Sequence, residues 1–116
     1  MLETILGIGE RLPGTTIDIK WDHHICLNVG NKMYLITTPD QNPINASVKV
    51  SDEKFDAFLE KEGVRIAPYL GRYKWIEIDD ISRFSVCEWE EIVKEAHELI
   101  AAKLSLKKRK ELGIEN

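Results

Sequence analysis

Four consecutive residues place positive charge beside flat aromatic rings. They are Arg72, Tyr73, Lys74 and Trp75, and the alternating pattern that they begin continues to Ile78, which is typical of a strand. Successive side chains of a strand point to opposite faces, so Tyr73 and Trp75 are expected to share one face and Ile78 the other. Exposed rings can stack on nucleic-acid bases while neighbouring cations contact phosphates. The alternative is that the rings pack against a helix or a loop, as large aromatic side chains usually do.

A second group of cations follows in the last turns of a long predicted helix. Lys107, Lys108, Arg109 and Lys110 either contact phosphate groups or form a solvated helix end that the helix dipole favours. Residues 103–116 contain five basic and two acidic residues, so this segment carries +3 and the other 102 residues carry −7. An acidic body argues against tight, sequence-independent binding of phosphates. Any affinity for nucleic acid is therefore expected to be weak and salt-sensitive.

The chain offers little for metal or thiol chemistry. His23, His24 and Cys26 are close in sequence, but adjacent histidines point to opposite sides, and no metal-binding spacing of Cys or His occurs. Cys87 is expected in the first turn of the last helix, where a thiolate is favoured, although Glu88 beside it opposes that effect. The alternative for Cys87 is a small, half-buried thiol without reactivity.

Catalytic motifs are also missing from the sequence. His97 is expected at the flank of the last helix and not as a general base, and no Gly-rich phosphate loop or nucleophile elbow occurs. We therefore expect a non-enzymatic protein with no catalytic residues, no metal ion and no cofactor.

Length and composition indicate one ordinary globular domain over residues 1–116. The 116 residues are 43% hydrophobic and 31% charged, and no apolar run approaches the roughly 20 residues of a membrane span. The first residues lack the basic region of a secretory signal, and two cysteines are too few for a disulfide scaffold. We expect a cytoplasmic monomer with reduced thiols.

Hydrophobic periodicity predicts a helix, four strands, a short helix, one or two further strands and a final helix. Runs of strands flanked by helices are typical of an α+β fold, with an antiparallel meander and the helices on one face. A type II′ turn is expected at Gly30-Asn31. The predicted elements are a helix over residues 1–12, strands at 17–21, 25–29, 33–37 and 44–50, a helix that Ser51 caps and Gly63 ends, extended segments at 64–67 and 73–78, and a helix with a capping box at Ser85 and an apolar stripe to Leu104.

The order of these segments resembles that of the MmcQ/YjbR family over residues 3–108. The resemblance rests on residues 12–14, 30–34, 48–50, 72–76 and 103–104 in that succession. It implies a frataxin-like (CyaY-like) α+β fold and a likeness to the double-wing DNA-binding domain of the phage regulator MotA. By this analogy the chain is expected to bind DNA. Ala96-His97 stands where the family usually has a Ser-Tyr pair.

The acidic body favours a second interpretation. Under this alternative the chain is a protein-interaction or small-ligand-binding module without a nucleic-acid role. The two interpretations differ in whether Arg72, Lys74 and the cations of residues 103–110 gather on one surface.

Overall fold

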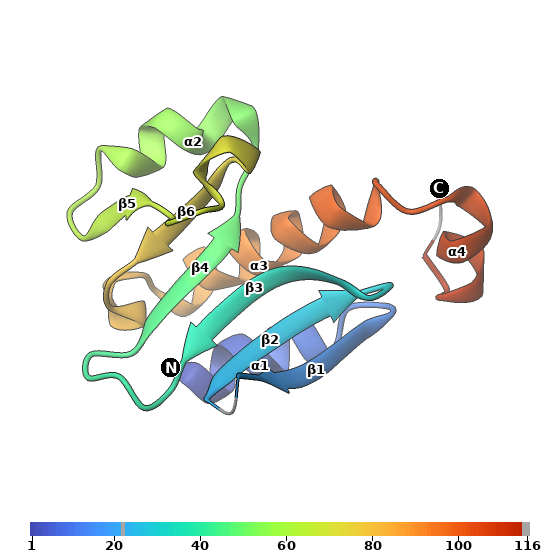
Figure 1. Ribbon diagram of the computed structural model, residues 1–116, viewed down its shortest axis with the longest axis horizontal. Coiled ribbons are helices and arrows are strands. Elements are labelled where there is room, and N and C mark those ends of the chain that lie inside the picture. The colour runs from blue at the N-terminus through green and yellow to red at the C-terminus, as the bar shows by residue number, and fades with distance from the viewer. Residues whose placement is uncertain (22, 115–116) are drawn as a thin grey trace.

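The chain folds into a six-stranded antiparallel sheet that carries its helices on one face (Figure 1). The computed structural model describes residues 1–21 and 23–114. Asp22, in the turn expected between the predicted strands at 17–21 and 25–29, and the last two residues of the basic segment 103–116 lie outside the described residues. The elements in chain order are α1 (Leu2–Glu10), β1 (Thr15–Lys20), β2 (His24–Val29), β3 (Lys32–Thr38), β4 (Asn45–Lys49), α2 (Asp52–Leu59), β5 (Val64–Ile66), the 3-10 helix η1 (Gly71–Tyr73), β6 (Trp75–Ile78), the 3-10 helix η2 (Ile81–Arg83), α3 (Val86–Ala101) and α4 (Leu106–Glu111).

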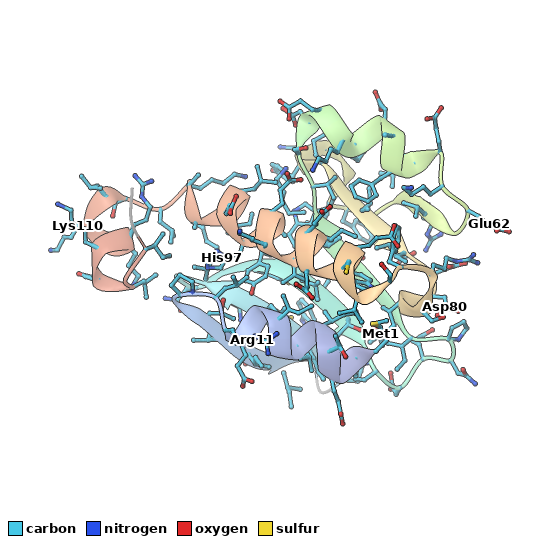
Figure 2. All side chains as sticks on the ribbon, turned by 180° about the vertical axis from the view of Figure 1, so that it is seen from behind. Met1, Arg11, Glu62, Asp80, His97 and Lys110 are labelled. Carbon is cyan, nitrogen blue, oxygen red and sulfur yellow. The ribbon has the colours of Figure 1, made fainter. Side chains whose placement is uncertain are left out.

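The sheet order is β1-β2-β3-β4-β6-β5, and every neighbouring pair is antiparallel. The first four strands form a meander, and β6 then pairs with β4 so that Val48 lies opposite Ile76. In Figure 2 the helices α1 and α3 lie in front of the sheet, whereas Figure 1 shows the opposite, uncovered face. The predicted α+β class with an antiparallel meander and helices on one face is confirmed.

The hydrophobic core lies between the sheet and the helices. One side of each central strand is apolar because side chains alternate along a strand, and Leu27, Leu35 and Val48 are fully buried on the helix side. The predicted apolar stripe of α3 meets them, with Trp89 fully buried at its start. The Trp89 indole N–H donates to the Ile81 carbonyl at 2.8 Å, which pairs the only polar atom of this ring.

Both predicted N-caps are present. The Ser51 hydroxyl accepts a hydrogen bond from the Lys54 N–H at 3.2 Å and begins α2. At α3, Ser85 and Glu88 form a reciprocal capping box, with bonds of 3.1 Å to the Ser85 hydroxyl and 2.9 Å to the Glu88 carboxylate. These bonds satisfy N–H groups that have no partner within the helix itself.

The long final helix is interrupted, contrary to the prediction. α3 ends at Ala101, and Leu104 packs so closely on the β2–β3 turn that an added Cβ on Gly30 would lie 2.7 Å from its Cδ1 atom. Ser105 then caps the separate helix α4, because its hydroxyl accepts from the Lys108 N–H at 3.1 Å. The cations at 107–110 therefore belong to a second helix.

The β2–β3 turn also differs from the prediction. Gly30 and Asn31 have φ values of 57° and 68°. Positive φ at both central residues defines a type I′ turn, so the expectation of type II′ is wrong.

Within the described ranges, the helices are too short or too polar for any of them to cross a membrane.

Candidate nucleic-acid interface

The uncovered face of the sheet holds a broad groove of about 670 Å³. Its floor comes from β2, β3, β4 and β6, and residues such as Met33, Ile36 and Ser47 line it. Two loops form its sides, the β1–β2 turn with Trp21 and the segment after β5 with Tyr69. The groove is thus an open sheet surface between two aromatic side chains.

Trp21 and Tyr69 are held in an unfavourable backbone conformation and are exposed to solvent. Their φ values are 52° and 66°, and their exposed fractions are 66% and 97%. Large side chains rarely adopt left-handed φ values, which cost about 1–2 kcal/mol for a non-glycine residue. Strain of this kind gathers at functional sites, where the surrounding structure maintains it. The strain at both positions therefore points to a role for the exposed ring.

The floor between the rings combines apolar and polar groups. His24 lies edge-on to Trp21, with 5.5 Å between ring centroids, and its Nδ1 atom is 3.0 Å from the Thr38 hydroxyl oxygen. The Glu77 carboxylate accepts a hydrogen bond from the Arg65 guanidinium on the neighbouring strand. This ion pair neutralises the acid in the floor, which makes the surface less repulsive to a phosphate group.

The two layers of the fold differ in charge. The strands contain four cations, Lys20, Lys32, Lys49 and Arg65, and two acids, Asp18 and Glu77. The helices α1, α2 and α3 contain two lysines and ten acids, which are Glu3, Glu10, Asp52, Glu53, Asp56, Glu88, Glu90, Glu91, Glu95 and Glu98. Because the helices lie on one face, half of the chain's 20 acidic residues lie behind the sheet as seen from the groove.

The structure divides the four residues that the sequence placed together at 72–75. Arg72 and Tyr73 belong to η1 and are exposed, and the guanidinium carbon lies 4.9 Å from the centroid of the Tyr73 ring. Lys74 has a left-handed φ of 64°, and its ammonium nitrogen lies 4.7 Å from the centroid of the Phe55 ring. The strand begins only at Trp75.

Trp75 is 5% exposed, so the expectation that it faces outward beside Tyr73 is wrong. The alternation itself is right, because Trp75 lies opposite Lys49 on the same side of the sheet as the groove residue Glu77. The chain before Trp75 turns back onto β6, and the Ala67 N–H donates to the Trp75 carbonyl at 3.1 Å. Tyr69 in this returning segment is the ring that reaches solvent instead.

One cation of the C-terminal segment, Lys103, acts electrostatically on Lys49 of β4. Lys49 is buried and donates to the Val50 carbonyl at 3.0 Å. Burial lowers the pKa of Lys49, and the nearby charges of Lys103 and Lys74 lower it further, whereas Asp52 opposes them. Lys103 thus approaches the Lys49–Lys74 pair.

The predicted cluster at 107–110 lies elsewhere. Its residues are on α4, which projects at one end of the molecule, where Figure 2 labels Lys110. Among the described residues that line the groove, none belongs to α4. Lys107, Lys108, Arg109 and Lys110 therefore do not share a surface with the two exposed rings.

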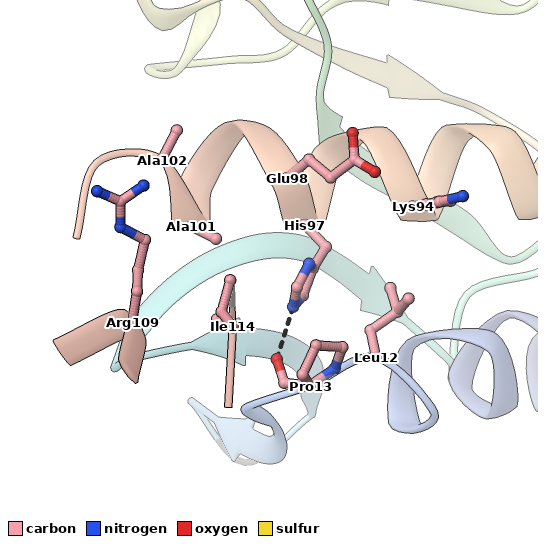
Figure 3. A pocket seen from close by; sticks show the side chains of 9 residues that line it. All are labelled: Leu12, Pro13, Lys94, His97, Glu98, Ala101, Ala102, Arg109 and Ile114. Carbon is pink, nitrogen blue, oxygen red and sulfur yellow. Dashed lines mark hydrogen bonds between the residues drawn. The ribbon is translucent and has the colours of Figure 1, made fainter. Parts of the chain in front are cut away.

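A second hollow, of about 440 Å³, lies between α3, α4 and the segment that joins α1 to β1 (Figure 3). His97 is 4% exposed at its base and donates from Nε2 to the Pro13 carbonyl, 2.7 Å away. The expectation that His97 is a flank residue is wrong. The spacing of four from Trp89 through Val93 to His97 places all three on one helical stripe, which is the signal that the sequence offered. The ring ties α3 to the chain before β1.

The described residues contain no group of three or more side chains suited to hold a metal ion. His23 and His24 have ring centroids 4.4 Å apart and planes tilted by 47°, and both line the groove, so the expectation that they point to opposite sides is wrong. Cys87 is exposed in the first turn of α3, as predicted, and Cys26 is buried in the sheet.

Comparisons with known proteins agree with this architecture. The sequence model of the YjbR family matches residues 10–99. A crystal structure of the Deinococcus radiodurans protein DR2400, which carries the family domain DUF419, superposes with a TM-score of 0.87. The two chains are 20% identical, and the alignment covers 99% of this chain and 89% of the other, so they share a fold. No curated protein matches the sequence.

Proposed function

Since the chain belongs to the YjbR family, whose model spans residues 10–99, we propose that it is a non-enzymatic, monomeric DNA-binding module that binds through the open face of its sheet. The observation that carries the proposal is the pair of exposed rings, Trp21 and Tyr69, on the two sides of one groove. Aromatic side chains on a sheet surface bind nucleic acids by stacking on bases.

The positions of the charges support the same surface. Arg72 is exposed three residues after Tyr69, and the strands carry four cations against two acids. Phosphate contacts from such cations position a nucleic acid without reading its sequence. The chain as a whole carries −4, so the affinity is weak and depends strongly on salt.

The test is a fluorescence-anisotropy titration of labelled duplex and single-stranded DNA at low salt, followed by a salt series. Arg72→Ala is expected to weaken binding and to reduce the slope of log K against log salt by about one, since one phosphate contact is lost. The double variant Lys107→Ala/Lys110→Ala is the matched control, because it removes two exposed cations from α4 and is expected to leave the affinity nearly unchanged. No binding of either DNA at low salt would refute the proposal.

A specific cleft favours a second function, the binding of a protein segment or a small ligand. It lies between α2 and α3, has a volume of about 270 Å³ and has an apolar floor of Phe58, Phe84 and Ile92. Lys54 and Glu95 form an ion pair of 3.2 Å that links the same two helices. Co-purification of a protein or metabolite that excess DNA does not displace, and that Phe58→Ala releases, would support this function.

A further inference from the structure

The two exposed rings are too far apart in the sheet to hold one planar group between them. Trp21 borders β2 and Tyr69 lies over the β6 side of the groove, with β3 and β4 between these strands. Three strand spacings amount to about 14 Å. Rings that sandwich one base are separated by about 7 Å, which is twice the usual contact distance. Each ring is therefore placed to stack on a base of its own.

Bases in a duplex do not suit this arrangement. They stack on one another at about 3.4 Å, and an aromatic side chain reaches their faces only after they are unstacked, which costs a few kcal/mol. A single strand presents the faces of separate bases without that cost.

The floor and the end of the groove suit the rest of a single strand. Uncharged hydrogen-bonding side chains line the groove where the edges of the bases would lie, those of Asn45 and Ser47 on β4 and that of Gln41 in the β3–β4 loop. Arg72, three residues after Tyr69, is exposed and supplies a cation for the phosphates. The acid in the floor, Glu77, is already neutralised by Arg65. An anionic strand is therefore less repelled at the groove than at the acidic surface of the helices.

From this geometry we infer that the groove binds single-stranded DNA, with Trp21 and Tyr69 stacking on two separate bases, and that it discriminates against duplex. The inference rests on the proposed DNA-binding function and specifies the form of DNA that is bound.

Tryptophan fluorescence gives a direct reading of this contact. All three tryptophans are described, and Trp21 is exposed whereas Trp75 and Trp89 are buried. Titration with an oligothymidine strand is expected to quench the emission, and a duplex of the same length is expected to bind at least about tenfold more weakly. The expected ratio follows from the contribution of one stacked base, about 1–3 kcal/mol.

Glycine variants remove each ring without adding strain, because glycine adopts left-handed φ values readily. Trp21→Gly and Tyr69→Gly are each expected to lower the single-strand affinity about tenfold and to leave duplex binding unchanged. Asn31→Gly is the matched control, since its φ of 68° is also left-handed and its side chain lies outside the groove lining. Trp21→Phe keeps a ring and is expected to retain most of the affinity in anisotropy. Circular dichroism checks that each variant is folded.

Two results would overturn the inference. The rings do not select single strands if the protein binds duplex as tightly as single strands. The same conclusion holds if both glycine variants bind single strands like the unmodified protein. In either case, measurable binding would still support the broader DNA-binding function. If the unmodified protein binds neither form at low salt, the inference and the proposed function fail together.

Discussion

Replacing Tyr69 with glycine is expected to stabilise the protein while weakening the proposed binding of DNA. The ring is 97% exposed, so its removal sacrifices almost no buried surface. The backbone φ of 66° is unfavourable for tyrosine and unrestricted for glycine. Stability and binding therefore change in opposite directions, which is the behaviour of strain maintained for function.

The size of the effect follows from two opposing terms. Relief of the left-handed conformation contributes about 1–2 kcal/mol to the free energy of unfolding. Glycine loses more backbone entropy on folding, which costs about 0.5–1 kcal/mol. The net gain is about 0.5–1 kcal/mol for Tyr69→Gly. Tyr69→Ala removes the same ring but keeps the Cβ atom and the strain, so its stability is expected to equal that of the unmodified protein.

Urea unfolding followed by circular dichroism measures both variants. The gain for the glycine variant corresponds to a rise of a few tenths of a molar in the urea midpoint, at the usual slopes for small proteins. A loss of more than about 1 kcal/mol in the glycine variant would mean that the ring is packed in solution and would refute the argument. A lower midpoint for the glycine variant than for the alanine variant would show that the backbone at Tyr69 is not strained, because only the entropy cost of glycine would then remain.

Three further predictions concern the scaffold that holds the groove. Burial raises the pKa of the Tyr34 hydroxyl to about 12 against 10 in the unfolded chain, while its hydrogen bond with Thr15 lowers it, so the folded state holds this proton more tightly. The contribution to the free energy of unfolding is complete below pH 10 and falls by about 3 kcal/mol between pH 10 and 12. Urea midpoints over this pH range are therefore expected to decline less in Tyr34→Phe than in the unmodified protein. His97→Ala leaves a cavity and an unpaired Pro13 carbonyl, and is expected to cost about 2–4 kcal/mol in urea unfolding; a cost below 1 kcal/mol would show that the 2.7 Å bond does not hold α3 in place. Ser85→Ala removes the N-cap of α3 and should cost about 1 kcal/mol, with a calorimetric melting temperature lowered by several degrees, whereas an unchanged melting temperature would contradict the capping box.

Local signals in the sequence predicted the elements that depend on nearby residues. Ser51 and Ser85 identified two helix starts because an N-cap bond joins residues three apart in the chain. The alternation of apolar residues predicted the meander, because each strand needs one face against the helices. Ser105 gave the same kind of capping signal, and recognising it would have separated α4 from α3.

The site was harder to predict, because alternation shows which face a side chain takes and not what covers that face. Trp75 does lie on the groove side of β6, yet the returning segment with η1 buries it. That segment depends on a tight turn from Gly71 to Lys74, closed by the bond from the Lys74 N–H to the Gly71 carbonyl at 2.9 Å. No periodicity in residues 67–74 indicates this turn, so Tyr69 did not stand out as an exposed ring.

The separation of charge between the layers changes the meaning of the acidic composition. A net charge of −4 argues against phosphate binding only if the acids share a surface with the ligand. Ten of them lie on α1, α2 and α3, about 10 Å behind the open face, which is the usual separation of packed layers. The Debye length is also about 10 Å at 0.1 M salt and about 30 Å at 0.01 M. At 0.1 M salt the open face is therefore largely screened from these acids, whereas at lower salt their repulsion reaches the groove. Lowering the salt thus strengthens both the attraction of Arg72 and the repulsion from the helices, so the affinity of the proposed site is expected to rise less steeply than a count of phosphate contacts alone would give.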